Sequence, residues 1–289
     1  MASRWYKAAG ASLLAAAVTA RYMAKWKRAR ALRRKAEQER LGATGRYFIG
    51  LDLTDPHTKR RRACDMAVLD PELQCSFSQW EYSEDGSSIV PTAVLGRAFL
   101  LAIAGPQGLA SQTEVQRRES ERALNAPGRT PYTLRDSGAP YAGFTAGSVT
   151  LFHKLVTSGS RFRLVGLQDE SLGNANLMEV YPGAGWKTIA GKGHLPRKNT
   201  AKGREARHAL LQAQGVRFPD SDLPSADQLD AAMAAWTGYC FNQGTARLEG
   251  LPPWLDERDR VIREGYIVQP ELPNEDAPIE EPEPYAPQG

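Results

Sequence analysis

Short apolar runs, each closed by a turn signal, restrict the fold class of this chain more than any other feature of its sequence. The first three runs cover residues 47–54, 62–69 and 74–82, and an Asp-Pro dipeptide follows the first and the second. Runs joined so closely predict an antiparallel meander. After residue 87, strand patterns alternate with helical patterns. The order predicts an α/β fold, in which a mixed sheet of three antiparallel strands and then parallel strands is flanked by helices.

The later elements are predicted from periodicity and from capping residues. The continuous apolar run Phe99–Ala104 is typical of a strand buried on both faces. Residues 161–167 and 176–181 predict two further strands. Residues 125–147 are expected to form a long loop, and the chain after Pro252 is expected to be turn-rich. Helices are expected at 87–95, 113–124, 148–158, 200–214 and 225–241, the last with Ser225 as its N-cap.

Charge divides the chain into three parts, because a basic segment and an acidic tail flank a core of mixed charge. Residues 1–45 predict a basic, partly apolar helix, residues 46–268 the folded domain, and residues 269–289 a disordered, Pro-rich acidic tail. The tail is expected to bind a protein partner or the basic segment. The cysteines form no CxxC motif and no Cys/His cluster, which disfavours a zinc site or a disulfide framework.

The N-terminal segment leaves several locations open. Its apolar stretch, residues 8–20, is shorter than the span of about 20 residues that a bilayer requires. The layout also fits a signal peptide. Together with the basic residues up to Arg40, it fits one helix that could lie on an anionic membrane or on nucleic acid phosphates. We favour a cytoplasmic protein and leave membrane association and export open.

Acidic residues at strand ends and helix starts are the main candidates for chemistry. Asp52 lies within the first strand, Glu179 late in the strand 176–181, and Asp227 and Asp230 three residues apart at the start of a helix. A carboxylate within a strand is costly to bury without a partner or a cation. Oxygen ligands suit Mg²⁺ and Mn²⁺, and two such ions can assist in-line attack on a phosphodiester. Each acid could also be an ordinary surface, salt-bridged or helix-dipole residue.

Four segments together resemble the DUF429 family, which is described as predicted nucleases with an RNase H-like fold. They are residues 48–54, 103–109 and 179–182 and the helix with Asp227 and Asp230. The resemblance covers roughly residues 47–250, and the Asp-x-x-Asp spacing also resembles the last helix of RuvC-type resolvases. It implies a two-metal nuclease using Mg²⁺ or Mn²⁺. The implied catalytic acids are Asp52, Glu179, Asp227 and Asp230, with Asp52, Glu179 and Asp230 as metal ligands.

Ala104 departs from the family pattern. Relatives tend to place an Asp at this position, at the end of the strand that contains Ile103, before Gly/Ala-Pro. Either this lineage lost a ligand, or an Asp was replaced to silence catalysis, and we favour the second interpretation. The resemblance therefore implies a family of nucleases and a chain that could bind its substrate without cutting it.

Basic residues after Glu179 are expected to bind a nucleic acid backbone, DNA or RNA, with Trp186 as a candidate for base stacking. A solvated helix face and a core Trp explain the same pattern equally well. Two other classes stay open: a sugar-kinase or actin-like ATPase, and a non-catalytic nucleic-acid-binding or scaffold protein of the RNase H-like class. The ATPase class lacks its second phosphate motif here. The basic candidates are Lys187, Arg197, Lys198, Lys202 and Arg204.

Overall fold

The computed structural model describes the core of the chain. Residues 1–44 and 273–289, which make up nearly all of the predicted N-terminal segment and acidic tail, lie outside the described residues. The chain divides into two compact units, Met1–Arg46 and Tyr47–Gly289. The structure describes residues 45–82, 87–135, 138–158, 161–167, 174–191, 193–218 and 222–272.

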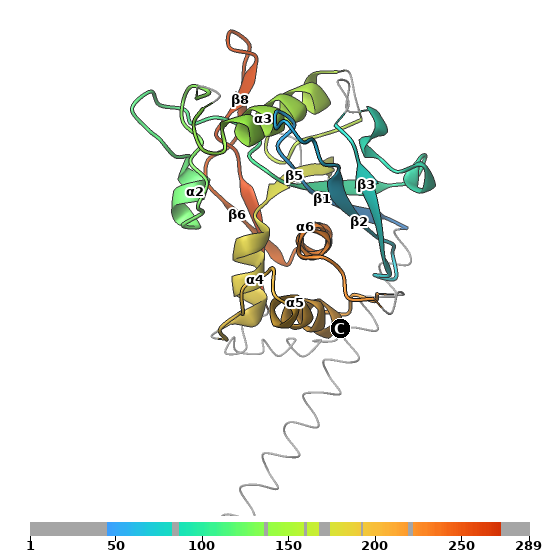
Figure 1. Cartoon of the computed structure of the whole chain (residues 1–289). Helices are drawn as coiled ribbons and strands as arrows, with labels where there is room; N and C mark the ends of the chain where they lie inside the picture. Colours follow the sequence, from blue (N-terminus) through green and yellow to red (C-terminus); the bar gives the residue numbers. More distant parts are fainter. Residues whose placement is uncertain are drawn as a thin grey trace, which may run out of the picture. The chain divides into compact units, whose positions relative to one another are not determined.

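A seven-stranded mixed sheet has the order β3-β2-β1-β4-β5-β9-β6 (Figure 1). Strands β1 (Tyr47–Asp52), β2 (Cys64–Leu69) and β3 (Cys75–Trp80) form the antiparallel meander that the sequence predicts. Strands β4 (Phe99–Ala104) and β5 (Leu177–Val180) follow in parallel to β1. The predicted α/β class, with antiparallel strands first and parallel strands after them, is confirmed.

The C-terminal strands were not expected from the sequence. Strand β9 (Ile267–Pro270) runs parallel to β5, and β6 (Ala246–Glu249) pairs with β9 in antiparallel register. Strands β7 (Trp254–Asp256) and β8 (Val261–Arg263) form a separate hairpin. The chain after Pro252 does turn at residues 257–260, but it also contains three strands that were not predicted, since strands of three or four residues are too short to show a clear alternation. The expected domain end at residue 268 falls inside β9.

Helix α6 (Ala226–Asn242) packs against one face of the sheet and is buried over most of its length. The hydroxyl of Ser225 accepts the backbone N–H of Gln228 at 3.0 Å, and the Gln228 side chain accepts the N–H of Ser225 at 2.8 Å. The predicted N-cap is therefore confirmed, as part of a capping box. Gly50 permits the close approach of β1 to this helix, because a Cβ at residue 50 would clash with the carbonyl oxygen of Ala231.

Helices α4 and α5 lie on the same side of the sheet as α6 (Figure 1). Helix α5 (Ala201–Ala213) begins after Thr200, whose hydroxyl accepts the N–H of Gly203. Helix α4 (Pro182–Ala190) begins at a proline that the sequence pattern marked only as the end of a strand. Proline suits the first helical position because its missing N–H has no partner there.

Helix α3 (Ala142–Thr157) covers the other face of the sheet, where Phe152 packs into a core with Leu51 and Ile103. Side chains of a strand alternate between faces, so Leu51 points toward α3 and Asp52 toward α6. The helix begins inside the predicted loop 125–147. None of the helices that the structure describes is long and apolar enough to cross a bilayer.

Three further expectations differ from the structure. The helix expected at 87–95 is two 3-10 turns, Ser87–Ile89 and Thr92–Val94, because Pro91 disfavours a helical residue before it. The helix expected at 113–124 is reduced to α2 (Glu119–Ala123). Residues 161–167 make only an isolated bridge, from Leu164 to Leu177, instead of a strand.

Candidate metal site

Three carboxylates meet where the end of β1 faces the start of α6. Oxygen atoms of Asp52, Asp227 and Asp230 lie within 4.8 Å of one another. Asp52 is the last residue of β1, and the two helix residues, three apart, share one face of α6. The structure thus brings together three of the four acids that were predicted for one site, from opposite ends of the folded unit.

Asp230 is held in place by two donors. The indole Nε1 of Trp186 donates to Asp230 Oδ1 at 2.6 Å, and Lys198 Nζ donates to Asp230 Oδ2 at 2.7 Å. Lys198 also donates to Asp227 Oδ1 at 3.3 Å. Trp186 is only 3% exposed, so the structure makes it a core residue and not a free stacking surface. Lys198, predicted to bind phosphates, here forms ion pairs with both helix acids.

Arg207 fixes the segment that carries Lys198. Its guanidinium donates to the carbonyl oxygens of Pro196 at 3.0 Å and Gly203 at 2.9 Å. The same group lies 5.6 Å from the ring centroid of Trp186. The buried Arg207 side chain therefore links the α4–α5 connection, which carries Lys198, to Trp186, which binds Asp230. The Lys198 ammonium and the Asp230 carboxylate are thus positioned by the same contacts.

The cluster holds more negative than positive charge. Burial raises the pKa of Asp52 well above its ordinary value of 3.8, and the charges of Asp230 and Asp227 raise it further, against the opposing effect of Lys198. Partial burial alone would lower the pKa of Lys198, but attraction to Asp230 outweighs it and the pKa is raised. Three carboxylates and one ammonium leave two formal negative charges. A divalent cation would cancel that excess, and an all-oxygen donor set fits Mg²⁺ or Mn²⁺.

Residues on two neighbouring strands flank Asp52 on the same face. Asp65 of β2 pairs with Asp52 in antiparallel register, and Ala104 of β4 pairs with it in parallel register. Burial raises the pKa of Asp65; a hydrogen bond from Gln79 opposes this effect and the charge of Asp227 adds to it. The sequence pattern does not identify Asp65, because its position opposite Asp52 depends on the register of the meander. An Asp at residue 104 would stand beside Asp52.

Glu179 lies on the opposite face of the sheet, which corrects its predicted place among the metal ligands. Its neighbour on β4 is Ile103, whereas Ala104 pairs with Val180. A difference of one residue turns a side chain to the other face, so Glu179 points away from Asp52. Its carboxylate accepts two bonds from Arg118, at 2.5 and 2.7 Å, and the backbone N–H of Gln107 at 2.8 Å.

The partners of Glu179 form a buried network of their own. Arg118 is fully buried and also contacts Glu121, whose carboxylate accepts the backbone N–H of Thr130 at 3.0 Å. Burial raises the pKa of Glu179, and the charge of Arg118 opposes that rise. The Glu179 carboxylate binds a guanidinium and the backbone N–H of Gln107, and so it ties β5 to the segment that follows β4. These partners occupy the carboxylate oxygens that a metal would need.

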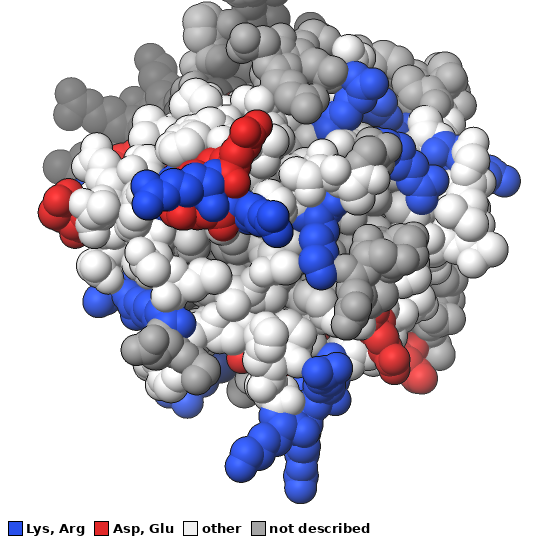
Figure 2. Space-filling view, turned by 90° about the horizontal axis from the view of Figure 1, so that it is seen from above, with Lys and Arg blue, Asp and Glu red and all other residues white. Residues whose placement is uncertain are grey.

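The remaining basic candidates are placed around the α4–α5 connection. Lys187, Arg197 and Lys202 are exposed, and Arg204 donates to the carbonyl oxygen of Pro224 at 3.4 Å, just before the cap of α6. Their role in binding nucleic acid stays a prediction. On the face that Figure 2 shows, acidic and basic side chains are interspersed among uncharged ones, without one large patch of a single sign.

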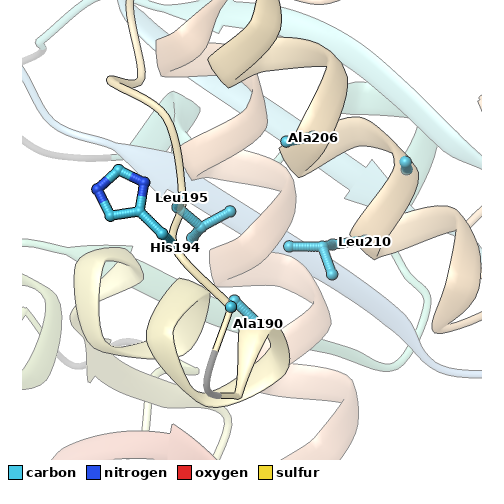
Figure 3. A pocket seen from close by; sticks show the side chains of 7 residues that line it. Ala190, His194, Leu195, Ala206 and Leu210 are labelled. Atoms are coloured by element: carbon cyan, nitrogen blue, oxygen red, sulfur yellow. The ribbon is translucent and has the colours of Figure 1, made fainter.

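A shallow apolar hollow of about 330 Å³ lies between the end of α4 and α5 (Figure 3). Ala190, Leu195 and Leu210 line it, and His194 at its rim is the one titratable residue of the lining. The three carboxylates are not part of this lining, so the hollow offers no donor set for a metal.

Fold and site define a mixed α/β protein whose sheet is consistent with an RNase H-like fold and whose β1 and α6 share an acidic cluster. The chain belongs to DUF429, a family described as "Protein of unknown function", whose model matches residues 101–253. The matched segment includes Lys198, Asp227 and Asp230, whereas Asp52 precedes it. Comparison with curated proteins and with solved structures gave no match.

Asp52→Asn is expected to stabilise the metal-free protein at neutral pH by about 1 kcal/mol, which for a domain of this size is about 2–4 °C in Tm. Since the pKa of Asp52 is raised, the folded state keeps a proton that the unfolded chain releases above 3.8. Stability is therefore lost as the pH rises from 3.8 through the raised pKa, and Asn escapes that loss.

Thermal unfolding in EDTA at acid and at neutral pH measures this effect. The gain should be present at neutral pH and should vanish in acid. Asp222→Asn, at an exposed position, is the matched control and should show no such pH dependence. A gain for Asp52→Asn that is equal at both pH values would contradict the prediction.

Proposed function

We propose that this protein is a divalent-metal-dependent nuclease that hydrolyses phosphodiester bonds at the cluster of Asp52, Asp227 and Asp230. The observation that carries the proposal is the convergence of these three carboxylates within 4.8 Å. The excess of negative charge at the cluster and the resemblance of the chain to predicted nucleases support it. We place the protein in the cytoplasm, in line with the absence of any disulfide among the cysteines that the structure describes.

Each residue of the cluster and its partners would have a separate role in this reaction. Asp52, Asp227 and Asp230 would hold Mg²⁺ or Mn²⁺, and such an ion would supply activation of water and stabilisation of charge on the phosphate. Trp186 orients Asp230 through its indole N–H, as an outer partner of a ligand does. The Lys198 ammonium, beside the same carboxylates, would also be placed to donate to a phosphate oxygen.

A two-metal mechanism needs oxygen ligands for two ions about 4 Å apart. Asp65 supplies an acid on the side of β2, and Ala104 leaves the side of β4 without one. This asymmetry favours a second candidate function, a nucleic-acid-binding protein that does not cleave. The ion pairs of Lys198 with both helix acids also favour this second candidate, because the ammonium already supplies part of the positive charge that a metal would bring.

Ala104→Asp is expected to raise Mn²⁺-dependent cleavage about tenfold or more, which corresponds to about 1.4 kcal/mol of transition-state stabilisation. The new carboxylate would stand beside Asp52 on the same face. The measurement is cleavage of labelled single-stranded DNA, duplex DNA and RNA by the wild-type chain and the variant.

Ala104→Asn is the matched control, because it adds similar bulk without charge. Adding Asp52→Ala to the Ala104→Asp variant should abolish cleavage, and cleavage that survives it would refute the assigned site. Nucleic acid binding without cleavage in every variant would favour the second candidate. ATP hydrolysis without nucleic acid would favour the ATPase class.

A further inference from the structure

Four consecutive basic residues, Lys59, Arg60, Arg61 and Arg62, lie in the connection between β1 and β2. We call this whole connection, residues 53–63, the basic loop. All four residues are exposed. Within the ranges that the structure describes, no salt bridge engages their side chains. Like charges at successive positions repel one another, so such a run gains stability when an external anion approaches it.

The basic loop is held by hydrogen bonds at several points. The Thr54 hydroxyl donates to the carbonyl oxygen of Arg62 at 2.8 Å, which closes the base of the loop. Thr58 Oγ1 donates to the carbonyl oxygen of Arg60 at 3.0 Å, and Asp55 Oδ1 accepts the N–H of His57 at 2.8 Å. A loop with a set backbone loses less conformational entropy when its side chains bind a ligand.

The basic loop starts and ends at the acidic cluster. It leaves β1 shortly after Asp52 and returns to β2 just before Asp65, the residue paired with Asp52. Thr54, two residues after Asp52, bonds to the carbonyl oxygen of Arg62, three residues before Asp65, so this end of the basic loop is tied to the edge of the cluster. On another side, the exposed Arg197 precedes Lys198, which contacts the helix acids. Exposed cations therefore lie in the two segments that adjoin the cluster in the chain, the β1–β2 connection and the α4–α5 connection.

We propose that the basic loop binds the sugar–phosphate backbone of a nucleic acid and guides one strand to the carboxylates. This inference rests on the proposed function, since it assigns the substrate contacts of the same site. The cluster has an excess of negative charge and repels phosphates, so a substrate needs cations beside it to offset that repulsion.

Nucleic acid fits this arrangement better than other polyanions. A phosphate chain can contact the basic loop with one segment and reach the carboxylates with the next. An anionic membrane is a broad surface, and it would need a wider basic face than one loop beside an acidic cluster.

The test compares two double variants that each remove two positive charges. Arg61→Gln/Arg62→Gln changes the basic loop, and Arg129→Gln/Arg258→Gln changes two exposed arginines in other loops. Fluorescence anisotropy follows the binding of fluorescein-labelled mixed-sequence oligonucleotides, in separate titrations with single-stranded DNA, duplex DNA and RNA. The full chain is used in EDTA over a series of salt concentrations, so that no metal-dependent cleavage interferes.

We expect the loop variant to bind at least one of these oligonucleotides about tenfold or more weakly at moderate salt. Its slope of log K against log salt should fall by about 2 in magnitude, which is about 1 per lost phosphate contact. The control variant should keep the wild-type slope. Arg61→Lys/Arg62→Lys retains the charges and should restore most of the slope, while folding of every variant is checked by circular dichroism.

Equal slopes for the loop variant and the control would overturn this inference and leave the proposed nuclease untouched, because cleavage is measured separately with Mn²⁺. A loop-dependent slope without cleavage in any variant would keep the binding surface and remove the nuclease. Binding of the wild-type chain to phosphatidylserine vesicles or to polyglutamate, without binding to any oligonucleotide, would also overturn the inference.

Discussion

Replacing Glu179 with alanine is expected to lower the free energy of unfolding by about 3–5 kcal/mol, because the change leaves a buried guanidinium without its main partner. Arg118 is fully buried, and its two short bonds to Glu179 are the closest that it makes. Glu121 remains as a partner, at 3.3 Å. Urea unfolding followed by circular dichroism, in EDTA, measures the loss.

The double variant Arg118→Met/Glu179→Met is the control for this prediction. Removing both charges leaves no guanidinium without a partner, and Glu121, which loses Arg118, keeps its hydrogen bonds from Thr130, so the double variant should recover part of the lost stability. It should also bind Mn²⁺ as the wild-type chain does, since Glu179 faces away from Asp52. If Glu179→Gln folds with wild-type stability in EDTA but loses Mn²⁺ affinity, Glu179 is a ligand and the structural assignment fails.

Asp230→Ala is expected to have two large effects. It removes a metal ligand, which should weaken Mn²⁺ binding about 100-fold or more, corresponding to about 2.7 kcal/mol. It also leaves the buried indole N–H of Trp186 without its acceptor and reduces the partners of Lys198 to Asp227, which should cost about 2–4 kcal/mol of stability in the metal-free protein. Isothermal titration calorimetry and unfolding in EDTA measure the two effects separately.

Two further variants sharpen the result for Asp230. Lys198→Met removes the cation that competes for the same carboxylates, so Mn²⁺ binding should tighten while the metal-free protein loses stability. Glu205→Ala, at an exposed position of α5, should change neither quantity. Unchanged Mn²⁺ affinity in Asp230→Ala would remove the metal site from this cluster.

The elements that the sequence predicts best are those with one dominant physical signal. Strand β4 is a continuous apolar run buried on both faces, and α6 begins at a serine followed three residues later by glutamine. Asp227 and Asp230 follow from the same helical spacing. These signals are local, since each depends on a few neighbouring residues.

The features that the sequence does not reveal depend on pairing between distant segments. Whether Glu179 faces Asp52 is decided by a register in which Ala104 pairs with Val180, and no local pattern records that choice. Asp65 joins the edge of the site for the same reason. The sequence does not distinguish Lys198 from the surface cations near it, because its position between two carboxylates depends on how Arg207 packs against the α4–α5 connection.

The strand order has a consequence for the synthesis of this protein. Strand β9 lies between β5 and β6, and its register joins Ile267 to Glu179 and Val268 to Val180. While the ribosome is still translating residues 246–270, β5 is an open edge, and an unpaired edge is a template for association with other chains. A shortened product that keeps only the family-matched residues 101–253 would lack β1, β2, β3 and β9. Such a fragment would present β4 and β5 with both outer edges open, so the family-matched segment lacks the neighbouring strands that complete the sheet.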